Sequence, residues 1–117
     1  MIIGDEDFCY VTTTGRATGH PHRIEIWYAS APERDTIYLL SGGRDRSDWV
    51  RNLASEPRCT VEVAGRKYIG NARILTAATD EDELARTLVF DKYSRDFGDL
   101  VAWRAEALPV AIDLHEE

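Results

Sequence analysis

The alternation of apolar and polar residues predicts three strands in the first third of the chain. Residues 8–13 are β-branched and aromatic and lead to the turn residue Gly15, which is typical of a strand. Residues 22–29 alternate with a period of two. One face of this second strand carries Ile24, Ile26 and Tyr28, and the other carries Arg23, Glu25 and Trp27. Residues 36–41 form a third apolar run, which ends at two glycines.

A short helix and a hairpin are predicted in the middle of the chain. Ser47 is a suitable N-cap for the helix, and Pro57 stops the pattern. The apolar stripe of this helix consists of Trp49, Val50, Leu53 and Ala54. Residues 59–64 and 67–75 then predict two strands joined by a turn at Gly65.

The last third of the chain predicts a longer helix and a closing strand. The helix begins after Thr79, which has Asp82 at the spacing of a capping box and acidic residues in its first turn. Its inner face carries Leu84, Leu88 and Val89. A loop or a second short helical piece over 97–106 follows, and residues 109–114 predict the sixth strand.

These elements predict an α+β fold, most economically a small six-stranded antiparallel barrel with flanking helices. With 117 residues the chain has room for one hydrophobic core. We expect a single domain over residues 8–114, a short N-terminal tail over 1–7 and a short C-terminal tail over 115–117. A functional site is therefore expected on or beside that core.

The distribution of charge favours a small anionic ligand. The net charge of −7 argues against non-specific binding of nucleic acid or of an anionic membrane. Residues 8–73 hold ten Lys and Arg against seven Asp and Glu, whereas residues 74–117 hold four against eleven. The first two thirds of the chain can therefore present a local positive potential to an anion, although the whole protein is acidic.

The chain lacks the patterns of export and membrane insertion. No apolar run approaches the roughly 20 residues that span a bilayer, and the N-terminus lacks the pattern of a signal peptide. A cytoplasmic location is expected by default, without an integral membrane segment. Cys9 and Cys59 lie in strand-like segments without a CxxC spacing, so we expect buried free thiols.

Several classes of enzyme lack their signature in this sequence. There is no motif of a dinucleotide fold, a phosphate-loop NTPase, a zincin or a GxSxG hydrolase. His20 and His22 would form a metal pair only with a third ligand such as Glu25 or His115. Pro21 favours an extended backbone that supplies no such ligand, so no metal site is predicted.

Two segments rich in glycine and arginine are candidates for anion binding. GRATGHPHR supplies Arg16, Thr18 and His22 as donors beside two glycines, although it could equally be a polar hairpin turn. SGGRDRSDWVRN places Arg44 and Arg46 before the start of a helix. Together the two segments could grip a phosphorylated or polycarboxylated ligand. Surface ion pairing of these arginines is the alternative.

Aromatic residues supply the other candidate surface. Most of them must belong to the core of so small a domain. Trp27 is the exception, because strand alternation places it on the polar face with Arg23 and Glu25. It could form a wall for a planar ring or a contact in a dimer.

Taken together, these segments resemble the deazaflavin-dependent nitroreductase/quinone reductase family. This family consists of small split-β-barrel proteins related in fold to the FMN-binding pyridoxamine-phosphate oxidase group. The resemblance extends from about residue 8 to residue 114 and rests on YVTTTGRATGHPHRIEIWYA, IYLLSGGRDRSDWVRNLASEPRCTVEV, GRKYIGNARIL and LPVAIDL. The pair of motifs TTGRxTGxPxxxxIWY and SGGxxxxxWVRNL is more specific to the family than either motif alone.

The resemblance implies that the chain binds coenzyme F420, a deazaflavin with a phosphate and an acidic polyglutamate tail. The implied contacts to the phosphate and tail are Arg16, Thr18 and His22. The ring is implied to border Ile24, Glu25 and Ile26, in a pocket completed by Leu40, Ser41, Gly42, Gly43 and Trp49. This chain has Ala17 where members often have Lys, and His22 where Arg commonly follows the Pro. Tail binding would then depend more on Arg44 and Arg46.

The resemblance also implies an oxidoreductase that passes hydride from the reduced cofactor to an electron-poor acceptor, such as a quinone, a nitroaromatic or an activated alkene. The resemblance implies that Tyr93 and Phe97 shape the substrate pocket, which Trp27 is also expected to line because of its place on the strand. Tyr28, Tyr93 or a water could protonate the product. A homodimer is expected by analogy with split barrels. An FMN-dependent oxidoreductase on the same barrel and a non-catalytic cofactor- or ligand-binding protein are the alternatives.

Overall fold

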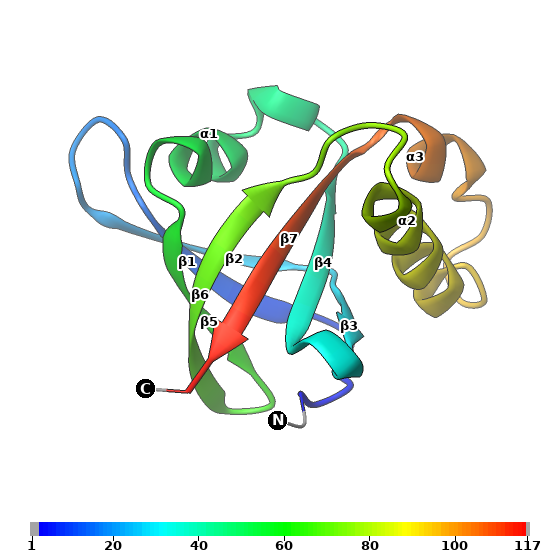
Figure 1. Cartoon of the computed structure of the whole chain (residues 1–117), viewed down its shortest axis with the longest axis horizontal. Helices are drawn as coiled ribbons and strands as arrows, with labels where there is room; N and C mark the ends of the chain where they lie inside the picture. Colours follow the sequence, from blue (N-terminus) through cyan, green and yellow to red (C-terminus); the bar gives the residue numbers. More distant parts are fainter. Residues whose placement is uncertain (1–2, 117) are drawn as a thin grey trace.

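The computed structural model describes residues 3–116 of the chain (Figure 1). Within these residues, seven strands form one antiparallel sheet: β1 (Cys9–Thr14), β2 (Pro21–Ile26), β3 (Ala29–Ala31), β4 (Thr36–Ser41), β5 (Arg58–Val63), β6 (Arg66–Ile74) and β7 (Leu108–His115). The α-helices of the same residues are α1 (Asp48–Ser55), α2 (Asp80–Tyr93) and α3 (Val101–Glu106). Short 3-10 turns are η1 (Pro32–Arg34) and η2 (Arg44–Arg46). The α+β class predicted from the sequence is confirmed.

The sheet has one strand more than the six predicted. The predicted strand over 22–29 divides at Trp27 and Tyr28, and the additional strand β3 pairs with β4 through Ala29 and Tyr38. The order of strands is β2-β1-β5-β6-β7-β4-β3, so β2 and β3 are the two edges. Because only two residues join these edges in the chain, the sheet must curl until its edges approach each other. The result is a half-barrel with its seam at Trp27 and Tyr28.

The hydrophobic core occupies both faces of the curled sheet. Along β4, Ile37 and Leu39 point into the inner cluster, whereas Tyr38 and Leu40 point into the outer one. The inner cluster also receives Val50 and Leu53 from α1, and the outer cluster is covered by α2 and α3. Burial of both faces explains why every residue of β4 is buried.

The two longer helices begin near the predicted caps. Thr79 caps α2, because its hydroxyl accepts a hydrogen bond from the backbone N–H of Asp82. Ser47 occupies the N-cap position of α1, but its hydroxyl pairs with that of Ser41 instead of capping the helix. Ala54, which was predicted in the apolar stripe of α1, is exposed.

Residues 3–7 are packed against the half-barrel and do not form the free tail that the sequence suggested. Ile3 belongs to the inner core cluster. The hydroxyl of Tyr28 donates to the carbonyl of Gly4 and accepts from the backbone N–H of Glu6. At the other terminus, β7 continues to His115, one residue beyond the predicted strand. Residues 1, 2 and 117 of the predicted tails lie outside the described residues.

Both cysteines are buried free thiols, as predicted from the sequence. Burial raises the pKa of Cys9 and of Cys59 to about 12, so neither thiol is a reactive nucleophile near neutral pH. No helix within residues 3–116 has the length and apolar composition needed to cross a membrane.

Candidate functional site

The loop between β1 and β2 has a fixed, self-bonded backbone. The N–H of Gly15 donates to the carbonyl of His20 over 2.8 Å, and the N–H of Gly19 donates to the carbonyl of Gly15 over 2.8 Å. Gly19 has a φ of 76°, which an L side chain rarely adopts. Figure 1 shows this loop extending beyond the sheet on the same side as α1.

One buried side chain, Asn52, connects this loop to the barrel. Its Oδ1 accepts hydrogen bonds from the backbone N–H of Arg16 at 3.2 Å and from Nη1 of Arg16 at 2.8 Å. Its Nδ2 donates to Oγ1 of Thr13, which is also buried, at 3.0 Å. Asn52 therefore fixes the loop, β1 and α1 relative to one another.

A polar pocket of about 400 Å³ lies between the loop and α1. It contains the three predicted anion contacts Arg16, Thr18 and His22, and its further lining residues are Gly15, Ala17, His20, Asp48 and Asn52. The guanidinium of Arg16 is not free in this pocket, because its Nη2 lies 3.0 Å from Oδ1 of Asp48. An anion that binds here therefore meets an arginine that is already paired.

Arg44 and Arg46 do not line this pocket, contrary to the predicted clamp of two loops. Both belong to η2, and Nη1 of Arg44 donates to the carbonyl of Glu106 at the end of α3. The hydroxyl of Ser41 holds this turn by donating to the carbonyl of Arg44 at 2.9 Å. Arg44 is therefore turned toward α3, whereas Asp48 and Asn52 of the same Gly/Arg segment line the pocket beside the loop between β1 and β2.

An aromatic groove of about 270 Å³ lies at the other end of β2. Its lining residues are Phe8, Glu25, Ile26, Trp27, Leu40 and Trp103. Three of the predicted ring contacts, Glu25, Ile26 and Leu40, thus come together in one groove. Since a strand rises about 3.3 Å per residue, the backbone of Ile26 lies about 13 Å from that of His22 in the polar pocket.

The remaining predicted ring contacts do not line this groove. Ile24 and Trp49 pack against the inner core cluster, and Ser41 is buried. Gly42 lies beside Trp103, since a Cβ placed at Gly42 would be 3.6 Å from the Trp103 ring. Gly43 allows the close approach of Ser47, whose Oγ would be only 2.6 Å from an added Cβ.

The predicted substrate contacts form an aromatic cluster at the seam of the half-barrel. The rings of Trp27 and Tyr93 stack with centroids 4.1 Å apart and planes 6° apart. Phe97 lies 4.6 Å from Trp27 and is 53% exposed, whereas Trp103 meets Trp27 edge to face at 5.8 Å. The ring of Tyr93 is therefore buried behind Trp27, and Phe97 is the member of the cluster that faces solvent.

The hydroxyls of Tyr28 and Tyr93 are in structural positions, which argues against the predicted role of either residue as a proton donor. The side chains of Tyr28 and Tyr93 are 0% and 2% exposed. The hydroxyl of Tyr93 lies 2.7 Å from the carbonyl of Asp7 and 3.0 Å from both the carbonyl and the N–H of Tyr28. Burial raises the pKa of Tyr28 to about 12 and also raises the pKa of Tyr93.

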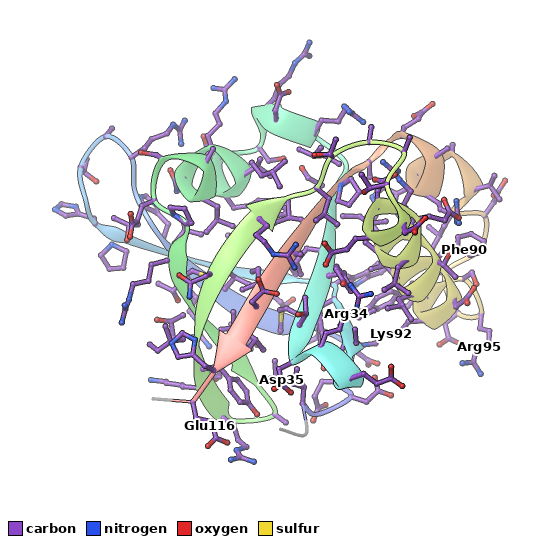
Figure 2. All side chains as sticks on the ribbon, in the orientation of Figure 1. Arg34, Asp35, Phe90, Lys92, Arg95 and Glu116 are labelled. Carbon is purple, nitrogen blue, oxygen red and sulfur yellow. The ribbon has the colours of Figure 1, made fainter. Side chains whose placement is uncertain are left out.

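Lys92, together with the hydroxyls of Tyr28 and Tyr93, holds residues 3–7 against the half-barrel. It lies on the side of α2 that faces the strands, whereas Phe90 and Arg95 lie on its outer side (Figure 2). Its Nζ donates to the carbonyl of Tyr28 at 2.9 Å and lies 3.3 Å from Oδ1 of Asp5. Burial lowers the pKa of this ammonium group.

Sequence reasoning missed four residues of the pocket and groove. Asp48 and Asn52 were not predicted to line the pocket, and Asp48 was considered only as a surface ion-pair partner of the arginines, although their spacing of four residues places them on one face of α1. Trp103 was assigned to the core, and Phe8 only to a strand. Within residues 3–116, no group of three or more His, Cys, Asp or Glu side chains is placed to hold a metal ion.

The fold of this chain is shared with solved structures that are described as reductases. A family model described as F420H(2)-dependent quinone reductase matches residues 3–115. The chain therefore belongs to the F420H2-dependent quinone reductase family, and it is an oxidoreductase whose cofactor is coenzyme F420.

Several solved structures share the fold at low sequence identity. A structure described as an F420-H2 dependent reductase (FDR-A) has a TM-score of 0.73 and 18% identity, over 98% of this chain and 99% of its own. A structure described as a domain-swapped dimer has a TM-score of 0.73 and 19% identity, over 95% of this chain and 81% of its own. A structure from Bacteroides thetaiotaomicron is described as a 5-nitroimidazole antibiotic resistance protein. It has a TM-score of 0.70 and 13% identity, over 94% of this chain and 74% of its own. Comparison with curated proteins gives no match.

Proposed function

We propose that the protein holds coenzyme F420 along β2 and reduces an electron-poor acceptor such as a quinone, a nitroaromatic or an activated alkene. The single observation that supports this most strongly is the pair of sites at the two ends of one exposed edge strand. The polar pocket suits the anionic part of the cofactor, and the aromatic groove suits its flat ring. The family supplies the cofactor, whereas the acceptor is our proposal.

The residues present fit this cofactor chemically. Arg16, Thr18 and the two histidines offer N–H and O–H donors to a phosphate or a carboxylate. A Cβ at Gly15 would come within 2.6 Å of Nε2 of His22, so the glycine leaves room for the His22 imidazole beside the loop. In the groove, Ile26, Leu40 and Trp27 offer apolar and aromatic surface to a planar ring.

When bound, the reduced cofactor supplies a hydride, and the protein supplies binding and orientation. Trp27 forms a rigid wall of the groove, because Tyr93 stacks behind it and Trp103 meets its edge. The apolar side chains of Ile26 and Leu40 exclude water from the face they cover. Phe97, exposed beside Trp27, is the aromatic surface available to an acceptor. Since both buried tyrosines are engaged with backbone groups, we assign proton transfer to solvent.

Two fluorescence titrations, one with F420 and one with FMN, test the cofactor site directly. We expect saturable binding of F420 and much weaker binding of FMN. Phe8 is 39% exposed and lines the groove, so Phe8→Ala should weaken F420 binding about threefold to tenfold. Val101→Ala is the matched control, because Val101 is 61% exposed and lies outside the groove.

Turnover with F420H2 then tests the acceptor. Menadione, a nitroaromatic and an activated enone should be reduced at rates that Val101→Ala leaves unchanged. Saturable F420 binding without reduction of any of the three would contradict the proposed acceptors. Equal losses of F420 affinity in Phe8→Ala and Val101→Ala would contradict the proposed position of the ring.

A homodimer is also proposed. One related structure is described as a domain-swapped dimer. In this chain the outer surface of β1, β2, β5 and β6 carries an open pocket of about 320 Å³ lined by Tyr10, Thr12, Arg23, Thr60, Glu62 and Lys67. Analytical ultracentrifugation measures the mass in solution, and a mass near 13.2 kDa at micromolar concentration would exclude the dimer.

A further inference from the structure

The positive charge of the polar pocket is largely neutralised within the protein itself. Arg16 is the one Lys or Arg among the described residues that line this pocket. Its Nη2 pairs with Asp48 at 3.0 Å and its Nη1 with Oδ1 of Asn52 at 2.8 Å. The Asp48 carboxylate lines the pocket and is 86% exposed, so its charge would oppose the binding of an anion there. The pair of Arg16 and Asp48 therefore has no net charge.

Two histidines are the remaining groups in the pocket that can become positive. His20 and His22 both line it and are exposed. Within residues 3–116 neither imidazole has a hydrogen-bond or ion-pair partner, so each can turn toward a ligand. His22 lies beside Gly15, where the missing Cβ leaves room for the ring.

The charged groups around these histidines come from three elements. Arg16 lies on the same loop, and Asp48 faces the pocket from α1. Arg58 of β5 lies on the other side of the loop, in a separate pocket with Gly19 and Pro21. One carboxylate and two arginines therefore surround the pair, and the carboxylate and one of the arginines line the same pocket as the two histidines.

We propose that His20 and His22, when protonated, supply the positive charge that holds the anionic part of the cofactor. Asp48 opposes that charge by neutralising Arg16. This inference rests on the proposed position of the cofactor. Binding then takes up protons, and affinity increases as the pH falls. Carboxylates stay ionised above about pH 5, so the ligand keeps its charge over this range.

The expected size of the effect follows from linkage. A histidine side chain ordinarily titrates near pH 6.5. If only the protonated form of an imidazole binds the anion, linkage lets the affinity for the ligand decrease by up to about tenfold per pH unit for each proton taken up, and histidine is the side chain that changes its charge between about pH 5 and pH 8. Removal of the Asp48 charge should strengthen binding several-fold at pH 8, because Arg16 then becomes available to the ligand.

Fluorescence titration of the full chain with F420 from pH 6 to pH 8 tests the inference without measuring turnover. The variant His20→Gln/His22→Gln should bind weakly with little dependence on pH, and Asp48→Asn should bind more tightly at pH 8. The matched control is His115→Gln, because His115 is the third histidine of the chain and is exposed at the end of β7. This control should retain the pH dependence of the wild type.

NMR adds a second readout that needs no cofactor. Inorganic phosphate should shift the imidazole signals of His20 and His22 at pH 6 and leave the signal of His115 in place. Saturable F420 binding that does not change from pH 6 to pH 8, or that responds equally to the His115 variant, would overturn the inference and leave the proposed function intact. Absence of F420 binding at every pH would overturn the proposed function, and the inference with it.

Discussion

Replacement of Asn52 by alanine tests whether one buried amide fixes the loop that forms the polar pocket. Asn52 is 3% exposed, and its side chain bonds to Thr13 and to two groups of Arg16. In Asn52→Ala the hydroxyl of Thr13 and the backbone N–H of Arg16 each lose a partner, at about 1 kcal/mol or more apiece. The guanidinium of Arg16 is partly exposed and can turn to water, so its bond adds little. The total loss of unfolding free energy is about 2–3 kcal/mol.

Urea unfolding followed by tryptophan fluorescence measures this loss. With an m-value of about 1–3 kcal/mol/M, the urea midpoint should fall by about 0.7–3 M at unchanged slope. Ser55→Ala is the matched control on the exposed face of α1, and it should change stability by no more than about 0.5 kcal/mol. Asn52→Asp keeps the oxygen that accepts hydrogen bonds from Arg16, so it should lose less unfolding free energy than Asn52→Ala. A loss in Asn52→Ala no larger than that of the control would refute the proposed role of this amide.

Two further predictions concern the sheet. Arg73 bonds to Glu81 at 2.6 Å and to Asp113 at 2.7 Å, and holds the pKa of both carboxyl groups below the usual range. The stabilisation is therefore present above about pH 4 and is lost as the pH falls through the lowered values. Arg73→Met should reduce the unfolding free energy at pH 7 by less than about 1 kcal/mol, because both ion pairs of Arg73 are partly exposed. The reduction should be smaller at pH 3, and thermal unfolding at the two pH values measures the difference. Gly70→Ala should cost about 1–3 kcal/mol in urea unfolding, since the new Cβ would lie 2.5 Å from Cγ2 of Ile112; a neutral result would show that the core relaxes there.

The strands and helices were predictable where a local pattern is strong. β4 and β6 were predicted within one residue of their ends, because β-branched and apolar runs between turn residues are local signals. β3 was missed because Ala29, Ser30 and Ala31 have low strand propensity and precede a proline. Its pairing with β4 comes from the curl of the sheet, which a local pattern does not encode.

The candidate site was predictable only in part, because its electrostatics depend on tertiary contacts. The composition of the loop indicated donors at Arg16 and His22, and both line one pocket. The pairing of Arg16 with Asp48 depends on how α1 docks across 32 residues of sequence, so the sequence alone overestimated the free positive charge. Similarly, Arg44 turned to the end of α3, a helix that the sequence indicated only weakly.

The central position of β7 has a consequence for how this protein folds. β7, the last strand of the described chain, lies between β6 and β4, and its pairing with β4 joins Thr36 to Asp113. Contacts of such long sequence separation slow folding, since the loop between them must close first. Until β7 enters the sheet, β4 and β6 each leave a hydrogen-bonding edge open. A nascent or truncated chain that stops before Leu108 would therefore expose two unpaired strand edges, which can pair with other chains and aggregate.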